Sequence, residues 1–163
     1  MAFGSQLSVC SCGYGISKVG EEMGEFTVHI VSWHDVEPLL RAVREAVFMR
    51  EQGVSAELEW DGLDEGCRHA LALNIKGEAI GCGRITQDGH IGRMAVLREW
   101  RGRKVGTALL EALLDEARRQ GFAEVDLGAQ VQALPFYRRF GFVEEGEVFM
   151  DAGMPHRRMR LRL

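Results

Sequence analysis

The sequence predicts an α/β (α+β) fold in which one mixed sheet is flanked by helices. Two observations predict it: strand-like and helix-like patterns intermix along the chain, and strands joined by short turns occur toward both ends. The length of 163 residues suits one compact domain with a core of its own. Hydrophobic and charged residues make up 46% and 27% of the chain, which is ordinary for a soluble globular protein.

The first 24 residues are predicted to be a disordered extension, and residues 25–163 to be the single folded domain. The opening is rich in Gly and Ser and lacks the hydrophobic periodicity of a helix or strand. It contains Cys10 and Cys12, which we interpret as free thiols, although a Cys-x-Cys pair also occurs in redox chemistry. No second ligand pair with zinc spacing follows, so no metal site is expected.

A strand, a long helix and an acidic loop are predicted next. Residues 26–32 alternate in polarity and are rich in β-formers, as in a strand. Ser32 or Asp35 caps the following helix, whose apolar residues recur at helical spacing until Gly53 ends it. Residues 56–67 are predicted to form a short acidic helix with loops on either side.

The middle of the chain predicts a hairpin, a strand and a second long helix. Residues 70–85 form the hairpin, with its turn at Gly77. A turn at Gly89 leads into a strand over residues 91–96. After a basic loop, an amphipathic helix runs from about residue 106 to 120.

The last quarter predicts a strand at residues 125–127, a short helix over 131–140 and two closing strands from Phe142 onward. The final strand carries the basic residues Arg157, Arg158, Arg160 and Arg162. We expect them to point outward on an edge strand, where charge discourages pairing with another sheet edge.

The basic loop between residues 97 and 105 is predicted to bind phosphate. A helix N-terminus offers unpaired N–H groups and a positive dipole end, and glycines at 102 and 106 allow close approach. Positive charge around it comes from Arg98, Arg101, Arg103 and Lys104. Neither the P-loop pattern nor the Rossmann pattern fits this stretch.

The loop resembles that of the Gcn5-related N-acetyltransferase (GNAT) family, which reads Arg/Gln-x-x-Gly-x-Gly/Ala. Arg101 and Gly106 match the first and last positions, whereas Lys104 stands where the middle glycine is usual. We expect a negative φ at Lys104, because a positive φ would strain a lysine and the loop shows no feature that compensates for such strain.

Three further blocks carry the resemblance. Ala133–Phe142 is similar to the short helix that places a tyrosine before a Gly-Phe turn, and residues 148–156 and 47–54 look like the bacterial ElaA/YjcF-type subgroup. The resemblance runs from about residue 26 to 163. It implies the GNAT acyl-CoA N-acyltransferase fold, with a mixed, mostly antiparallel central sheet.

The resemblance also implies an acetyl-CoA-dependent N-acetyltransferase that needs no metal. The acetyl group would pass to a primary amine of a small molecule or peptide, by direct attack in a ternary complex. The residues implied to bind acetyl-CoA are Met94, Ala95, Val96, Arg101, Gly102, Arg103, Lys104, Val105, Gly106, Thr107 and Gln130. Backbone groups of the first three would pair with the pantetheine arm as if it were a strand.

Tyr137 matches the family's donor of a proton to the departing thiolate; in the alternative reading it is a core residue. His90 occupies the place where several relatives carry a glutamate base. Strict alternation from His90 would put it on the same face as Met94 and Val96. An unperturbed histidine, with a pKa of about 6.5, can accept the ammonium proton. A solvent-facing turn histidine explains His90 equally well.

The acceptor is expected to bind near Glu51 and His156, and both of these, with His69, are further candidates for the base. Six acidic residues and no basic one fall between positions 51 and 65. They predict either an acidic lip that attracts cationic amines, such as polyamines or aminoglycosides, or a solvated helix face.

Two other functions remain open. One is an acyl-CoA-binding or sensing module that has lost turnover, which Lys104 and the absence of a clear base would explain. The other is an acyl-homoserine-lactone-synthase-like acyltransferase. The net charge of −4 predicts no nucleic-acid or membrane partner. Without a recognisable signal peptide, the cytoplasm is the expected location. A homodimer is compatible with these observations.

Overall fold

The computed structural model describes residues 24–163, so Cys10, Cys12 and almost all of the predicted extension lie outside the described residues. The elements in chain order are β1 (Phe26–Ser32), α1 (Trp33–Arg44), η1 (Glu45–Glu51), α2 (Ala56–Glu59), η2 (Asp64–Gly66), β2 (Arg68–Asn74), β3 (Ala79–Ile85), β4 (His90–Val96), η3 (Arg98–Trp100), α3 (Val105–Arg119), β5 (Glu124–Gln130), η4 (Val131–Ala133), α4 (Leu134–Arg138), β6 (Val143–Asp151) and β7 (Met154–Arg162). The predicted elements are therefore present, and η1 continues the first helix as a π-helix.

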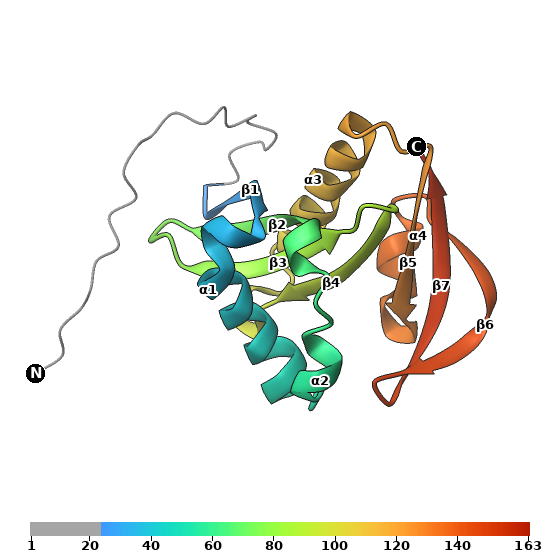
Figure 1. Ribbon diagram of the computed structural model, residues 1–163, viewed down its shortest axis with the longest axis horizontal. Helices are drawn as coiled ribbons and strands as arrows, with labels where there is room; N and C mark the ends of the chain where they lie inside the picture. Colours follow the sequence, from blue (N-terminus) through green and yellow to red (C-terminus); the bar gives the residue numbers. More distant parts are fainter. Residues whose placement is uncertain (1–23) are drawn as a thin grey trace, which may run out of the picture.

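The strands form one seven-stranded sheet in the order β1-β2-β3-β4-β5-β7-β6. Neighbouring strands are antiparallel except for β4 and β5, which run parallel. In Figure 1, α1 and α3 lie on opposite faces of the β1–β4 half, and β5, β7 and β6 splay away from that half. This is the mixed, mostly antiparallel sheet that the resemblance implied.

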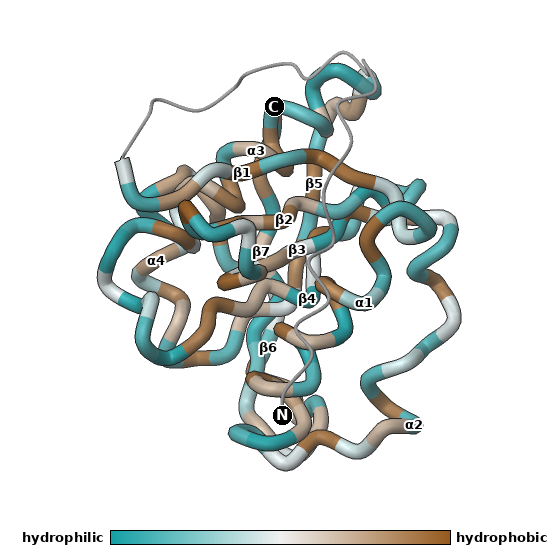
Figure 2. The backbone as a smooth tube through the Cα atoms, turned by 90° about the vertical axis from the view of Figure 1, so that its left-hand side faces the viewer, coloured by the Kyte–Doolittle hydropathy of each residue, from teal (hydrophilic) through white to brown (hydrophobic). Residues whose placement is uncertain are grey.

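The core is divided by the sheet into two parts. On one face, α3 contributes Leu109, Leu110 and Leu113, which are fully buried with residues from the strands and from α4. On the other face, Leu40 and Val43 of α1 are buried. Figure 2 shows the brown, hydrophobic stretches gathered along the central strands, with teal, hydrophilic stretches in many outer loops. Along residues 24–163, no helix has the length and apolar character needed to cross a membrane.

The last strand differs from the sequence prediction, because β7 is inserted between β5 and β6 and is not an edge. Arg157, Arg158 and Arg160 form ion pairs with acidic residues of the two neighbouring strands. Arg158 Nη2 lies 2.7 Å from Asp126 Oδ2 on β5, and Arg160 Nε lies 2.9 Å from Glu145 Oε1 on β6. The ion pairs of β7 therefore connect it to β5 and β6. The prediction that its arginines point outward on an edge strand is wrong.

Candidate active site

The predicted phosphate loop borders a large cavity. The loop leaves β4, passes through η3 and enters α3 at Val105. The cavity of about 720 Å³ lies between this loop, the first turns of α3, and α4. Its lining residues are Val96, Trp100, Arg101, Gly102, Lys104, Val105, Gly106, Thr107, Glu111, Phe136, Arg139 and Phe140. Seven of them had been assigned to the cofactor from the sequence.

The residues that the sequence analysis missed here come mainly from α4 and its C-terminal end. Phe136 and Phe140 are four residues apart, so their rings lie on one face, with centroids 5.4 Å from each other. The guanidinium of Arg139 lies 5.7 Å from the ring centroid of Phe136 and adds a cation to the cavity. The helical spacing of the two phenylalanines was the signal that could have identified this wall.

Lys104 adopts φ = 64°, so the expected negative φ is wrong. It is the N-cap residue of α3 and has the left-handed conformation, and its carbonyl accepts the hydrogen bond of Ala108 N at 3.1 Å. The chain must turn sharply to enter the helix at this point, and glycine would do so at lower cost. The usual glycine of the family thus has a conformational explanation, and lysine adopts the same conformation under strain.

Arg101 and Glu51, which had been assigned to cofactor and acceptor respectively, contact each other. Arg101 donates from Nη1 and Nη2 to the two carboxylate oxygens of Glu51, at 2.7 and 2.8 Å. Its Nε donates to the carbonyl of Val96 at 3.0 Å. The hydrogen bonds from Arg101 lower the pKa of Glu51. The arginine therefore connects the loop to the end of β4 and to η1.

Strand β4 contains a bulge at Arg93, and it changes the predicted face of His90. The register with β3 shifts here, and Arg93 has φ = 51°. Ile91 packs in the core on the α3 side, and Met94 packs against the same core, although strict alternation would place the two on opposite faces. His90 consequently faces the α1 side of the sheet, away from Met94, and the predicted shared face is wrong.

Beyond the bulge, the edge of β4 that faces β5 is unpaired within residues 24–163. The two strands pair only through His90 with Asp126 and Ile91 with Leu127. Successive residues of a strand turn their backbone groups to opposite neighbours, so Met94, Ala95 and Val96 cannot all present theirs to this edge: Ala95 is paired with Cys82 of β3. The Val96 carbonyl accepts the hydrogen bond from Arg101 Nε.

At the far end of β5, the amide of Gln130 is held by two other glutamines. Its Nε2 donates to Gln52 Oε1 at 3.2 Å, and its Oε1 accepts a hydrogen bond from Gln132 Nε2. Gln130 does not line the large cavity. Gln52 follows η1, so this contact joins β5 to the α1 side.

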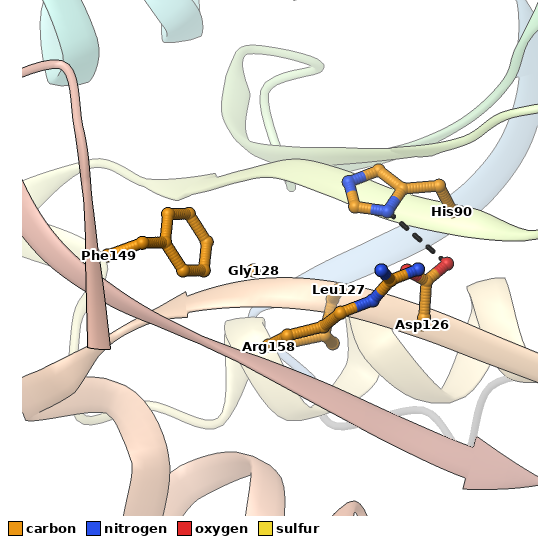
Figure 3. A pocket seen from close by; sticks show the side chains of 6 residues that line it. All are labelled: His90, Asp126, Leu127, Gly128, Phe149 and Arg158. Atoms are coloured by element: carbon orange, nitrogen blue, oxygen red, sulfur yellow. Dashed lines mark hydrogen bonds and ion pairs between the residues drawn. The ribbon is translucent and has the colours of Figure 1, made fainter. Parts of the chain in front are cut away.

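His90 lies in a second, smaller cavity of about 290 Å³ on the α1 side. It is lined by His90, Asp126, Leu127, Gly128, Phe149 and Arg158. Figure 3 shows the imidazole directed at Asp126, with Nδ1 3.4 Å from Oδ1, and the Phe149 ring on the other side of the pocket. Asp126 also accepts hydrogen bonds from Arg158, so the pocket contains a His–Asp–Arg series.

Tyr137 is buried in the core on the α3 side and does not line the large cavity. Its ring makes edge contacts with Phe136 at 5.0 Å and Phe142 at 5.9 Å between centroids. Burial raises the pKa of Tyr137 to about 12, so the phenol is a weaker acid than an unperturbed tyrosine, which is also protonated at neutral pH. The position of Tyr137 is therefore compatible with both interpretations, a core residue and a proton donor.

The other histidine candidates are enclosed by protein. His156 is 8% exposed, holds the Met154 carbonyl at 2.8 Å through Nδ1, and stacks on Phe149. It lies opposite Gln130 in the sheet. His69 is 1% exposed, and its Nε2 lies 2.9 Å from the Asp64 carbonyl. Burial lowers the pKa of His69, and the ring packs against Trp33.

Half of the predicted acidic lip is neutralised inside the protein. Arg44 Nε donates to Glu59 at 2.5 Å and its Nη1 to Asp64 at 2.6 Å. Arg84 bridges Asp64 and Asp61. Although burial opposes ionisation, the two arginines hold the pKa of Asp64 below its usual value. These acids therefore form neither a solvated face nor a lip that attracts cations.

The same cluster anchors the bulge of β4. Arg93 Nη2 donates to the carbonyls of Leu58 and Glu59, at 3.2 and 3.1 Å, and to Asp61 at 3.3 Å. The α2 segment is thus connected to the strand that carries His90. Within residues 24–163, no group of three or more His, Cys, Asp or Glu side chains is placed to hold a metal ion.

Comparison with known proteins identifies the family. The profile of the acetyltransferase (GNAT) domain matches residues 38–163. The uncharacterized N-acetyltransferase YjcF of Bacillus subtilis is 39% identical over 121 residues, which cover 72% of this chain and 86% of YjcF. ElaA of Escherichia coli is 33% identical over 125 residues, covering 72% and 81% of the two chains.

Solved structures agree with the sequence comparison. The crystal structure of E. coli ElaA has a TM-score of 0.74 at 29% identity, over 82% of this chain and 97% of ElaA. An acyl-CoA N-acyltransferase from Pseudomonas aeruginosa has a TM-score of 0.73 at 28% identity, over 83% and 98%. The sheet with its parted central strands is therefore the GNAT acyl-CoA N-acyltransferase fold, and the chain belongs to the GNAT family of acetyltransferases, as a relative of YjcF and ElaA.

Proposed function

We propose that this protein is an acetyl-CoA-dependent N-acetyltransferase that acetylates a primary amine by direct attack in a ternary complex. The observation that carries the proposal is the unpaired edge of β4. One cavity, at Val96, lies at the C-terminal end of this edge, and the other contains His90, which pairs with β5 before the unpaired edge begins. A donor bound along the edge would reach from the first cavity toward the second.

The larger cavity fits the phosphate end of an acyl-CoA. Arg101, Lys104 and Arg139 supply three cations, and one acidic residue, Glu111, lies among the lining residues. The first turn of α3 offers backbone N–H groups from Val105 onward, which favour anionic oxygens. Backbone groups of β4 would hold the pantetheine arm by strand-like hydrogen bonds. Bound there, the donor supplies an activated thioester.

In the proposed reaction, the amine nitrogen forms a bond to the acetyl carbon as the carbon–sulfur bond breaks. His90 accepts the proton that the ammonium loses, directly or through water, and Tyr137 donates a proton to the thiolate. The phenol is protonated at neutral pH and can therefore donate, and burial, which raises its pKa to about 12, makes it a weaker acid than an unperturbed tyrosine. We assign Glu51, at the end of η1, and His156, which supports Phe149, to the acceptor side.

The proposal is tested by incubating the protein with acetyl-CoA and a panel of amines while the released CoA thiol is measured. Calorimetry with acetyl-CoA runs in parallel. An enzyme binds acetyl-CoA and releases thiol in proportion to acetylated amine. A protein that binds acetyl-CoA and gains thermal stability, yet acetylates no amine, would be a binding module, and the enzymatic assignment would be wrong.

A further inference from the structure

The acceptor of this enzyme can be narrowed from the cavity that contains His90. We infer that this cavity binds a small aromatic monoamine, with its ring packed on Phe149 and its amine directed to His90; this inference rests on the proposed N-acetyltransferase function. The cavity is formed by four strands: β4 supplies His90, β5 supplies Asp126 to Gly128, β6 supplies Phe149 and β7 supplies Arg158.

The position of the cavity is the first argument. His90 and Val96 mark the two ends of β4, roughly 20 Å apart along a strand of this length. The donor cavity includes Val96, and the unpaired edge of β4 leads from it to His90. An acyl chain paired along that edge is therefore directed at the smaller cavity. An amine bound there approaches the thioester from the end opposite the phosphates.

The wall of the cavity selects an apolar, flat group. Phe149 keeps 42% of its surface exposed and lines the cavity, so its ring offers apolar area that a ligand can cover. Its ring is already fixed by stacking on the buried His156, at 5.9 Å and 27°. A fixed ring loses little entropy when a second ring packs on it.

Gly128 keeps the floor of the cavity open. A Cβ at this position would lie 3.4 Å from Phe149 Cζ, so any side chain would occupy the space beneath the ring. The φ of Gly128 is not in the left-handed region, so the backbone conformation does not require glycine here. Glycine at this position therefore lets the tip of the Phe149 ring lie over β5 and keeps the space beside the ring free of a side chain.

The charge of the cavity argues against a polyamine or an aminoglycoside. Its one carboxylate, Asp126, accepts two hydrogen bonds from Arg158, at 3.1 and 2.7 Å, and lies next to His90. The guanidinium of Arg158 neutralises it, so the cavity has no uncompensated carboxylate to hold the additional ammonium groups of a polycation. The acids at 59, 61 and 64 are compensated by arginines as well. A volume of 290 Å³ is also at the lower end for small-molecule sites.

The experiment measures acetyl transfer to 2-phenylethylamine, spermidine and kanamycin, each with acetyl-CoA. We expect kcat/KM for phenylethylamine to exceed that for either polycation by about tenfold or more, the scale of one well-buried aromatic contact. Preference for spermidine or kanamycin would overturn the inference while leaving the acetyltransferase function intact. Transfer to no amine, with acetyl-CoA bound, would instead contradict the proposed function.

Matched variants localise the site. Phe149→Ala should raise KM for phenylethylamine by about tenfold, whereas Met150→Ala, the next residue on β6 and outside the cavity, should leave it within twofold. Gly128→Val should block phenylethylamine, while Gly66→Ala should not. If Phe149→Ala or Gly128→Val fails to fold, the milder Phe149→Leu or Gly128→Ala takes its place. Every variant must bind acetyl-CoA with the affinity of the wild type. Equal KM values for Phe149→Ala and Met150→Ala would show that the ring does not bind the acceptor.

Discussion

Arg101 binds Glu51 through a two-pronged ion pair, with Nη–Oε distances of 2.7 and 2.8 Å. The pair joins the loop that borders the large cavity to the end of η1 on the other side of the sheet. Because the carboxylate offsets the charge of the arginine, it reduces the attraction between the loop and a phosphate. The connection also fixes the guanidinium beside the end of β4, where it holds the Val96 carbonyl.

Replacing Glu51 by glutamine should therefore tighten acetyl-CoA binding by about two- to fivefold, the equivalent of the roughly 0.5–1 kcal/mol of an exposed charge interaction. Calorimetry at low and high salt measures the change, which should shrink as salt screens the charge. Glu57→Gln removes a carboxylate from an exposed position outside the cavity and serves as the control. Weaker binding by Glu51→Gln would mean that the pair orients Arg101 for the phosphate.

Lys104→Gly should stabilise the protein by about 0.5–1 kcal/mol, because glycine adopts the φ of 64° without the penalty of a Cβ. Relief of this strain stabilises the folded state. The larger conformational entropy that glycine gives the unfolded chain offsets part of that gain. Urea unfolding measures it. Lys104→Ala is the matched variant, since it removes the charge but retains the strain. An equal loss of acetyl-CoA affinity in both variants would assign that loss to the missing cation. An unchanged unfolding midpoint in Lys104→Gly would contradict the proposal that Lys104 is strained.

Gly106→Val should reduce acetyl-CoA affinity by more than about tenfold with a small loss of fold stability. A Cβ here would lie 3.7 Å from Phe136 and 3.8 Å from Val96, which is ordinary contact, so the fold has room for it. The added methyl groups would occupy the cavity at the first turn of α3. The expected cost in stability is below about 1 kcal/mol, as for a β-branched residue in a helix. Calorimetry and thermal unfolding separate the two effects, and unchanged affinity would refute the assignment of this loop to the cofactor.

Tyr137→Phe should lower turnover by about 10- to 1000-fold and leave acetyl-CoA affinity within a few-fold, since only a hydroxyl is removed. The pKa of Tyr137 is raised to about 12 by burial, so the proton is lost only as pH rises through that value. Wild-type turnover should accordingly show no alkaline decline attributable to this residue below about pH 11. If the variant turns over like the wild type at every pH, another group or solvent protonates the thiolate.

His90→Ala should flatten the acidic limb of the pH–rate profile, because the proposed base would be absent from the reaction. His34→Ala, which removes an exposed histidine on α1, is the control and should retain the limb. The measurement is kcat/KM against pH with a fixed amine. An unchanged limb in His90→Ala would assign proton removal to water or to a carboxylate.

The sequence was sufficient to predict the local elements and the position of the basic loop that borders the large cavity. Hydrophobic periodicity located α1 and α3, and turn residues located the β2–β3 hairpin, because these signals act between residues close in the chain. The loop before α3 was recognisable because the helix N-terminus, Gly106 and the surrounding cations are contiguous. The same local pattern carried the resemblance to the GNAT family, which the comparisons confirm.

Tertiary structure decided the features that depend on distant pairings. The bulge at Arg93 reversed the predicted face of His90, because one extra residue in a strand exchanges its two sides. The acidic residues near η2 form ion pairs with arginines of α1, β3 and β4, and Glu51 forms one with Arg101. The spacing of these residues along the chain does not indicate any of these pairs. Insertion of β7 between β5 and β6 brought Arg158 and Phe149 to the His90 pocket. The sequence alone thus determined which local structures form, whereas the folded sheet determined which side chains come into contact. Strand pairing and buried ion pairs join residues that are distant in the chain, so they stabilise the protein only once it has folded.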